Sequence, residues 1–290
     1  MTTNNRITTA LMFPGQGSQV PGMRESVEQH CPDLLDLLYS SLGECPFERI
    51  DEGTRFAQPA VYCAALAGWI GAGRPDFDYA AGHSLGEVAA LVAAGCLSPE
   101  DGLRIAILRG RLMQQAAERG PKGGMMALLG DDAAARTVAR LSGLPVSNDN
   151  APGQIVVSGP DWRLVSAAAR AKAERLRAIR LRIQGAFHTP AMLPALPDFS
   201  AALAKIDFQV PRVPVFSSTT ASPFEDPRGG LASGLTDPVH WRGTLTSLHG
   251  LGVKRYLEAG PGRVLSGLVR RTIPGADVRV LKPEPPETKT

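Results

Sequence analysis

Hydrophobic residues along this chain fall into short apolar runs separated by longer segments with a helical repeat. The apolar runs predict strands at 7–14, 77–81, 213–217 and 255–259. The helical repeat predicts helices at 24–42, 60–70, 85–94 and 99–117. Strands that alternate with helices predict an α/β fold, in which a mostly parallel sheet carries helices on both faces.

A different order of elements begins near Gly123. Strands are predicted at 125–129, 144–148, 154–158 and 178–184, and helices at 131–142 and 161–177. The order β-α-β-β-α-β is typical of a ferredoxin-like unit. We therefore expect a ferredoxin-like subdomain at 124–187, inserted between the two parts of a large domain, 1–123 and 188–282. The last residues, 283–290, are rich in Pro, Glu and Lys and are expected to be disordered.

The sequence Gly82-His83-Ser84-Leu85-Gly86 lies where the strand at 77–81 meets the helix at 85–94. A Gly-x-Ser-x-Gly pattern in this context is typical of a turn that exposes a nucleophilic serine. The two glycines leave room for the tight turn, and the start of the following helix favours a developing oxyanion. The pattern indicates acyl transfer at Ser84. The alternative is that these five residues form a plain strand-to-helix turn without a catalytic role.

Arg109 lies on the apolar face of the helix predicted at 99–117. With 100° between successive residues, it falls on the same side as Ile105, Leu108 and Leu112. A guanidinium on an apolar face is costly to bury unless an anion meets it. Two interpretations follow: a structural ion pair with an acidic side chain, or a receptor for the carboxylate of a substrate.

The chain contains five histidines, of which two are candidates for a general base. His83 adjoins Ser84, but neighbouring residues on a tight turn point apart, so it is poorly placed. His188 and His240 remain, and His188 follows a glycine turn before a helix. A structural role for His188 stays open. The loop Gly15-Gln16-Gly17 after the first strand allows close backbone approach or forms a simple glycine turn.

Composition excludes several classes of protein. Hydrophobic residues make up 43% and charged residues 20% of the 290 residues, as in soluble globular proteins. No apolar run is long enough to span a bilayer, and the N-terminus does not resemble a signal peptide. The four cysteines have no zinc or disulfide spacing, and a net charge of +3 does not indicate nucleic-acid binding. We expect a cytoplasmic protein without a metal.

Seven motifs together resemble the malonyl-CoA:acyl carrier protein transacylase family, which includes freestanding trans-acting polyketide synthase acyltransferases. The resemblance covers about residues 7–282. The motifs are Phe13-Pro14-Gly15-Gln16-Gly17-Ser18-Gln19, Gly82-His83-Ser84-Leu85-Gly86, Arg109-Gly110-Arg111-Leu112-Met113-Gln114, Asn150-Ala151-Pro152-Gly153-Gln154, Gly185-Ala186-Phe187-His188, Asp237-Pro238-Val239-His240-Trp241 and Glu258-Ala259-Gly260-Pro261-Gly262. It implies a hydrolase-like large domain with a ferredoxin-like insertion, in agreement with the fold expected above.

The resemblance also implies the roles of the reacting groups. Ser84 would be the nucleophile and His188 the base that activates it. The backbone amides of Gln16 and Leu85 would form the oxyanion hole. The reaction would pass through an acyl-Ser84 intermediate and needs no bound cofactor, since a coenzyme A thioester is the substrate.

Four further residues receive roles from the resemblance. Arg109 would hold the free carboxylate of a malonyl group. The backbone carbonyl of His240 would orient the imidazole of His188, at a position where the family often has glutamine. Phe187 and His83 would line the substrate pocket. Phe187 resembles the form of its motif associated with malonyl rather than methylmalonyl groups.

Malonyl-CoA and the phosphopantetheine thiol of an acyl carrier protein are the partners that the resemblance implies. Alternatives are a thioester hydrolase of the same fold, a transferase for another acyl unit, and an idle carrier-binding subunit. The sequence between 163 and 182 is the most basic part of the chain. It predicts either a solvated face or a docking surface for an acidic carrier near Arg170, Arg175, Arg177, Arg180 and Arg182.

Overall fold

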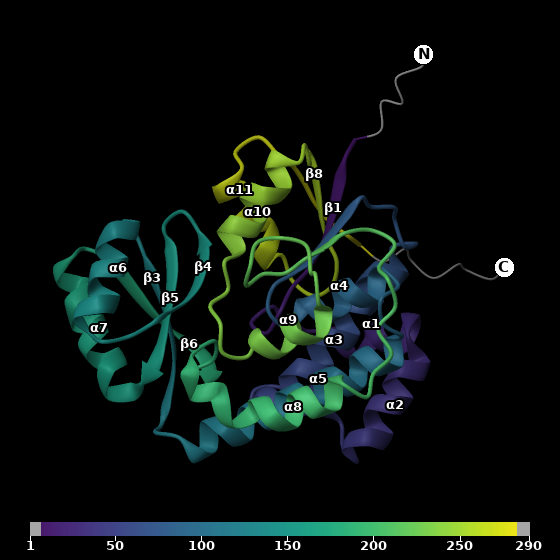
Figure 1. The fold of residues 1–290 in the computed structure, drawn as a ribbon, viewed down its shortest axis with the longest axis horizontal. Coiled ribbons are helices and arrows are strands. Elements are labelled where there is room, and N and C mark those ends of the chain that lie inside the picture. Colours follow the sequence, from purple (N-terminus) through teal and green to yellow (C-terminus); the bar gives the residue numbers. More distant parts are fainter. Residues whose placement is uncertain (1–6, 283–290) are drawn as a thin grey trace.

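The structure is a computed structural model that describes residues 7–282, so the tail predicted at 283–290 lies outside the described residues. Two sheets form separate layers, with the smaller one and its helices on the left of Figure 1. The large sheet has five parallel strands. In order across the sheet they are β7 (Val215–Phe216), β2 (Tyr79–Gly82), β1 (Thr9–Phe13), β8 (Arg255–Glu258) and β9 (Asp277–Val280).

Helices cover both faces of this sheet. They are α1 (Met23–His30), α2 (Pro32–Leu42), α3 (Thr54–Gly71), α4 (Gly86–Ala93), α5 (Pro99–Arg119), α8 (Leu196–Leu203), α9 (Pro227–Ser233), α10 (Trp241–Gly250) and α11 (Val264–Thr272), with short 3₁₀ helices at Pro46–Glu48 and Pro190–Ala195. The α/β class predicted from the sequence is confirmed.

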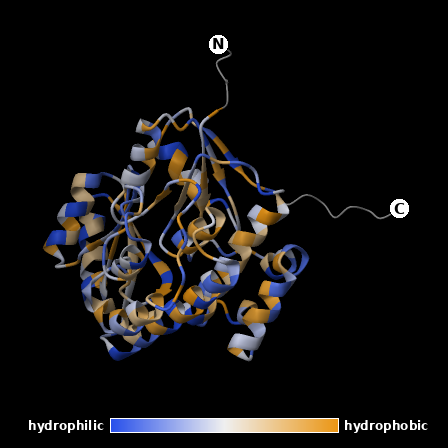
Figure 2. Ribbon diagram, turned by 45° about the vertical axis from the view of Figure 1, so that its right-hand side comes forward, coloured by the Kyte–Doolittle hydropathy of each residue, from blue (hydrophilic) through white to orange (hydrophobic). Residues whose placement is uncertain are grey.

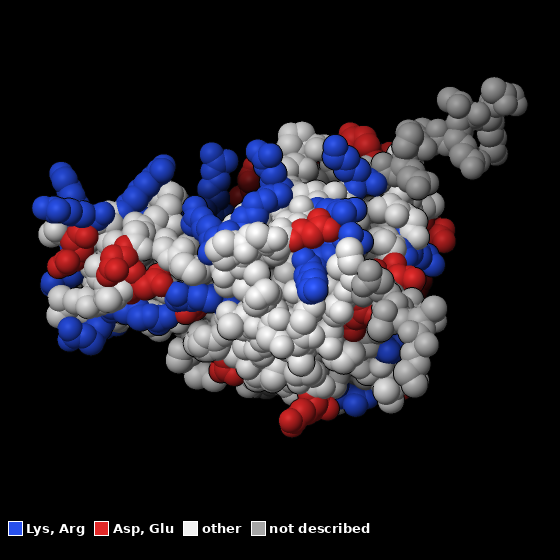
Figure 3. Space-filling view, turned by 90° about the horizontal axis from the view of Figure 1, so that it is seen from above, with Lys and Arg blue, Asp and Glu red and all other residues white. Residues whose placement is uncertain are grey.

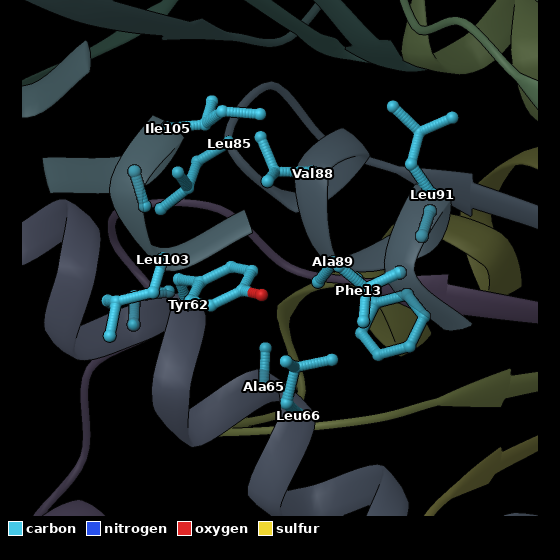
Figure 4. Packing of buried hydrophobic residues seen from close by; sticks show 14 of the residues in the cluster. Phe13, Tyr62, Ala65, Leu66, Leu85, Val88, Ala89, Leu91, Leu103 and Ile105 are labelled. Atoms are coloured by element: carbon cyan, nitrogen blue, oxygen red, sulfur yellow. The ribbon is translucent and has the colours of Figure 1, made fainter. Parts of the chain in front are cut away.

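The alternation of side chains along the central strand explains why two layers of helices are needed. Leu11 and Phe13 of β1 join one hydrophobic cluster, whereas Ala10 and Met12 join another on the opposite face. All four are fully buried. Successive side chains of a strand point to opposite faces, so a strand apolar at every position needs cover on both. Figure 4 shows Phe13 beside Leu66 of α3 and Ala89 of α4, and Leu103 and Ile105 of α5 belong to the same cluster. Figure 2 shows hydrophobic residues on the central strands and on parts of the surrounding helices.

The smaller sheet is antiparallel and carries its two helices on one face. Across the sheet its strands are β4 (Val146–Ala151), β5 (Gln154–Pro160), β3 (Gly123–Leu129) and β6 (Arg177–Gln184), and its helices are α6 (Asp132–Leu141) and α7 (Asp161–Ala173). A separate hydrophobic cluster that includes Leu128, Val138 and Leu164 joins sheet and helices. This is the ferredoxin-like arrangement expected from the order of elements.

The structure differs from the predicted elements in several places. The helix predicted at 24–42 is two helices, because Cys31 leaves the helical conformation and Pro32 starts a new helix. The helix predicted at 60–70 begins earlier, at Thr54, and contains Pro59. The edge strand β9 was not predicted, since it has only four residues and just two of them, Val278 and Val280, are hydrophobic.

Arg242 of α10 links the two sheets. Its guanidinium donates hydrogen bonds to Asp149 of β4 at 2.8 Å and to Asp132 of α6 at 2.6 Å. Beside it, the amide of Asp149 donates to the carbonyl of Val239 at 2.8 Å. The edge of the small sheet is thereby fixed against the segment that precedes α10, and the neighbours of Asp149 in β4, Asn148 and Asn150, line the cleft described next.

Candidate active site

Ser84 lies on a strained turn between β2 and α4. Its φ of 54° is in the left-handed region, which is unusual for a residue with a side chain. A Cβ at Gly82 would stand 1.9 Å from the backbone of Gly86, and a Cβ at Gly86 would stand 2.1 Å from the carbonyl oxygen of Phe13. Only glycine fits at these two positions. The tight packing holds the Ser84 hydroxyl at the carboxyl end of the parallel strands.

The hydroxyl of Ser84 contacts the imidazole of His188. Ser84 Oγ and His188 Nε2 are 2.8 Å apart, although 104 residues separate them in the chain. His188 is buried and also has a positive φ, 56°. Burial, and then the nearby charges of Arg109 and His83, lower the pKa of His188 to about 3. The imidazole is therefore neutral near pH 7 and can accept the proton of Ser84.

The second ring nitrogen of His188, Nδ1, is buried on the side away from the Ser84 contact, which uses Nε2. Within residues 7–282 Nδ1 has no hydrogen-bond partner. The backbone carbonyls of Asp237 and Gly234 raise the pKa of His188 against the effect of burial. The carbonyl of His240 accepts bonds from Thr244 N and Oγ1, at 2.9 and 3.2 Å. The orienting role given to the His240 carbonyl therefore stays a prediction.

Arg109 is buried beside the same hydroxyl. Its side chain donates to Ser84 Oγ at 3.1 Å and to Gln58 Oε1 at 2.7 Å. Both partners are neutral, and no ion pair to Arg109 occurs within residues 7–282. Burial lowers the pKa of Arg109 to about 10, and the negative charge of Glu87 opposes this shift. The structural ion pair that the sequence left open is absent from the described residues, so the guanidinium can still receive a carboxylate.

Gln58 was not identified from the sequence. It is almost fully buried in α3, and its amide donates to Thr54 Oγ1 at 2.8 Å and to Met113 Sδ at 3.3 Å. These bonds fix which way its carbonyl oxygen faces, and that oxygen holds Arg109. The available signal was a polar residue, just before Pro59, in an otherwise apolar helix. The sequence does not show that its partner is Arg109.

The loop after β1 brings the amide of Gln16 close to the serine turn. A Cβ at Gly15 would stand 2.5 Å from the carbonyl oxygen of His83, so this approach requires glycine. The side chain of Gln16 is held by a bond from Thr54 Oγ1 at 2.7 Å. Within residues 7–282 no hydrogen bond uses the amides of Gln16 or Leu85, and both residues line the cleft. Two free amides beside a nucleophile can stabilise an oxyanion.

A cleft of about 510 Å³ between the two sheets contains these groups. Phe187 lies buried in its wall. His83 Nε2 lies 2.8 Å from Asn150 Oδ1 of β4, and its ring packs against Trp241 with centroids 5.5 Å apart. His83 therefore faces the small sheet and not the serine hydroxyl. Every residue predicted for the site lines this cleft except His240.

Among residues 7–282 no group of three or more His, Cys, Asp or Glu side chains is arranged to hold a metal ion. Of the helices formed by these residues, none combines the length and the hydropathy required to span a membrane.

The sequence of this chain is similar to those of known acyltransferases. A family model described as acyl transferase domain matches residues 46–243. The chain is 37% identical to the polyketide biosynthesis protein ThaF of Burkholderia thailandensis over 95% of its own length, but it spans only 25% of ThaF. It is 35% identical to the malonyl CoA-acyl carrier protein transacylase of Salmonella typhimurium, covering 91% of this chain and 92% of that protein.

Solved structures agree with the sequence relatives. The malonyl CoA-acyl carrier protein transacylase of Coxiella burnetii superposes with a TM-score of 0.86 at 31% identity, over 95% of this chain and 94% of that one. The corresponding protein of Xanthomonas oryzae pv. oryzae gives a TM-score of 0.86 at 35% identity, over 95% of both chains.

Proposed function

This chain belongs to the acyl transferase domain family, and we propose that it is a malonyl-CoA:acyl carrier protein transacylase. It moves a malonyl group from malonyl-CoA through an acyl-Ser84 intermediate to the phosphopantetheine thiol of an acyl carrier protein. The observation that carries the proposal is one set of contacts: Ser84 Oγ lies 2.8 Å from His188 Nε2 and 3.1 Å from a nitrogen of Arg109. A nucleophile, a base and a carboxylate receptor thus meet at one atom.

In the first half-reaction Ser84 attacks the thioester carbonyl. His188 takes the hydroxyl proton through Nε2 as the new C–O bond forms. The amides of Gln16 and Leu85 donate to the oxyanion. When the C–S bond breaks, the proton on His188 neutralises the departing thiolate of coenzyme A. The malonyl group remains as an ester of Ser84, with its free carboxylate on Arg109.

The second half-reaction reverses these steps with a different thiol. His188 removes the proton of the carrier's phosphopantetheine thiol, and the sulfur attacks the ester carbonyl of malonyl-Ser84. The same amides hold the oxyanion, and the proton returns to Ser84 as the C–O bond breaks. Each half-reaction begins and ends with a neutral imidazole, for which the low pKa of His188 is suited.

Two groups support the preference for a malonyl unit. The hydrogen-bond partners of Arg109 are neutral, so a carboxylate that enters the cleft gives the guanidinium its first anion in direct contact. Phe187 is buried in the cleft wall one residue before the base, where a methyl branch on the acyl group would compete for space. Such steric selection is limited, because one methyl group in a pocket is worth only about 1–3 kcal/mol.

We also propose where the carrier docks and where the enzyme works. Lys and Arg side chains protrude from the small-domain end of the molecule, with some acidic side chains among them (Figure 3). Arg170, Arg175 and Arg177 are exposed there, and Arg182 is exposed beside the cleft. An acidic carrier fits this surface.

All four cysteines are free, which is consistent with a cytoplasmic location.

The proposal is tested by intact-mass analysis after incubation with a panel of acyl-CoAs, followed by a chase with candidate carrier proteins. Malonyl-CoA should label the protein by one malonyl group, a carrier should remove the label, and Ser84→Ala should abolish labelling. Labelling by other acyl-CoAs in preference to malonyl-CoA would identify a transferase for a different unit. Rapid loss of the label to water without a carrier would identify a thioester hydrolase of the same fold.

A further inference from the structure

Glu87 is a buried carboxylate that the proposed reaction does not use. It lies in the first turn of α4, three residues after Ser84, and is 3% exposed. Its Oε1 accepts three hydrogen bonds: from Ser218 N at 2.6 Å, from Ser218 Oγ at 2.9 Å and from Ser217 Oγ at 3.4 Å. All three donors are neutral. A buried acid that is held in this way, without a cation in direct contact, needs an explanation beyond an ion pair.

The contacts of Glu87 connect the serine turn to the chain that faces His188. Ser217 and Ser218 follow β7, and the carbonyl of Ser218 accepts a bond from the amide of His240 at 2.6 Å. The other carboxylate oxygen, Oε2, lies 3.6 Å from the point where a Cβ at Gly234 would stand. Gly234 and Asp237 provide the carbonyls that act on His188. Glu87 thus binds the start of the 217–240 segment and lies near Gly234 within it.

We propose that Glu87 is a positioning residue, whose ionised carboxylate fixes the 217–240 segment against the serine turn and offsets the charge of Arg109 when His188 becomes protonated. The role concerns the reactive Ser84–His188 pair, and it rests on the proposed function only for the identity of the acyl donor. It requires Glu87 to act through other groups and not to touch the substrate.

The charges around Glu87 explain why its ionisation affects the rate. Arg109 of α5 and His83 of the serine turn both act on His188 and lower its pKa, and Arg109 also interacts with Glu87. When Ser84 attacks, His188 becomes an imidazolium close to the positive charge of Arg109. An ionised Glu87 reduces the cost of that second positive charge, whereas a protonated Glu87 leaves it uncompensated.

Glu87 also titrates in an accessible range. Burial raises its pKa to about 7, and the bonds from Ser218 and the charge of Arg109 oppose this rise. His188 stays neutral through the same range, because its pKa is lowered to about 3. A rise in the reactivity of Ser84 between pH 6 and 8 would therefore come from Glu87 and not from the base itself.

The experiment measures the labelling of Ser84 by a neutral, serine-directed fluorophosphonate as a function of pH. In this step Ser84 Oγ bonds to phosphorus, fluoride leaves and His188 takes the proton, so no acyl donor, carboxylate or carrier is involved. In the unmodified protein the rate should rise through about pH 7. Glu87→Gln should remove this rise and lower the rate at pH 8 about tenfold, as expected for one lost charge interaction of about one pKa unit.

Glu258→Gln is the matched control. Glu258 is also a fully buried glutamate with two neutral backbone donors, Leu265 N at 2.9 Å and Ser266 N at 2.7 Å, but it caps α11. This variant should keep the rise near pH 7. If Glu87→Gln also keeps it at an unchanged rate, the proposal is overturned. Failure to label with malonyl-CoA while the probe behaves as expected would count against the proposed function alone.

A second variant covers the case in which Glu87→Gln does not fold. Ser218→Ala removes one donor to Oε1 and leaves the backbone donor in place. Since hydrogen bonds to the ionised form lower the pKa of Glu87, losing one should move the rise to higher pH by about half a unit to one unit. An unshifted midpoint would overturn the assignment of the rise to Glu87.

Discussion

At the residue scale, substrate selection follows from the burial of Arg109 with no anion in direct contact among the described residues. Its two hydrogen-bond partners are the neutral groups Gln58 Oε1 and Ser84 Oγ. A carboxylate on the acyl group would therefore gain a charge-assisted, bidentate contact that an acyl group without a carboxylate, such as acetyl, cannot make. We predict that Arg109→Ala lowers the rate of Ser84 acylation by malonyl-CoA at least about a hundredfold, as expected for loss of about 3 kcal/mol.

The matched control for this prediction is Arg109→Lys. Lysine keeps the charge but not the planar fork, so it should retain part of the preference for malonyl-CoA over acetyl-CoA. The measurement is the ratio of the two acylation rates, followed by intact mass. If Arg109→Ala left that ratio unaltered, Arg109 would not be the carboxylate receptor.

A second prediction at the residue scale concerns how His188 makes the stability of the fold depend on pH. Its pKa falls from an ordinary 6.5 to about 3 in the folded protein, chiefly through burial. Below pH 6.5 the unfolded chain binds this proton and the folded chain does not, so stability falls as the pH falls, until about pH 3. The loss should be about 1.4 kcal/mol for each pH unit within this window.

Urea unfolding of the protein and of His188→Asn between pH 4 and 7 measures this effect. As the pH falls, the unfolding free energy of the unmodified protein should decrease more than that of His188→Asn. Glu87 titrates in the same window with the opposite sign, since its folded pKa is raised to about 7, and the subtraction removes its contribution. A difference that stays constant with pH would show that His188 titrates normally in the folded state.

Single residues were predictable here where their side chains carry the chemistry. Ser84, His188 and Arg109 each have a residue type suited to one role, and the structure brings the three together. The role of the His240 carbonyl stays a prediction, because any residue can supply a main-chain carbonyl and Nδ1 of His188 has no hydrogen-bond partner among the described residues. Gln58 was missed for a related reason: an amide becomes functional only through its partner, which lies 51 residues away.

At the scale of elements, the strand–turn–helix around Ser84 is the part on which the site depends most. β2, the turn and α4 fit only because Gly86 allows the carbonyl of Phe13 to come within 2.1 Å of where a Cβ would stand. We predict that Gly86→Ala destabilises the protein by about 3 kcal/mol, since overpacking against backbone cannot be relieved by a rotamer change. Thermal unfolding, combined with labelling of Ser84, checks this.

Gly267→Ala is the control for that substitution. Gly267 lies in α11, where an added Cβ meets nothing within 4 Å. Alanine there should stabilise the helix by about 0.5–1 kcal/mol. Equal and small effects of the two substitutions would mean that the serine turn tolerates a side chain at position 86.

The elements themselves were largely predictable, because hydrophobic periodicity reflects burial. The strands at 7–14 and 77–81 were found since their cores are continuously apolar, as two-sided burial requires. The break at Pro32 was missed although proline is a strong signal, because the apolar repeat continues across it in α2. Such a repeat shows which residues are buried, but it does not show whether one helix or two present them.

At the scale of the whole molecule, the order of elements predicted both sheets but not how they meet. The cleft depends on contacts that join distant segments, such as Arg242 to Asp149 and Asp132, and His83 to Asn150. No local pattern encodes these pairs. The boundaries at 124 and 187 stay a prediction, although the strands of the small sheet run from Gly123 to Gln184.

The small-domain surface carries the last prediction, which concerns the carrier. Arg175 and Arg177 are exposed and do not line the cleft, so they can contact a protein partner without touching malonyl-CoA. We predict that Arg175→Glu with Arg177→Glu raises the apparent KM for an acidic carrier about tenfold, because like charges then face each other across the interface. Acylation of Ser84 by malonyl-CoA should be unchanged.

Steady-state transfer at several carrier concentrations and salt concentrations checks this docking surface. The effect should weaken as salt increases, because exposed charges are screened over about 8–10 Å near physiological ionic strength. Arg111→Glu reverses an exposed charge on α5 of the large domain and should leave the carrier KM unaltered. If the double variant slowed acylation of Ser84 and transfer to the carrier equally, the substitutions would have disturbed the fold of the small domain and not a docking surface. An unchanged KM would move the docking surface elsewhere, with the exposed Arg182 beside the cleft as the next residue to reverse.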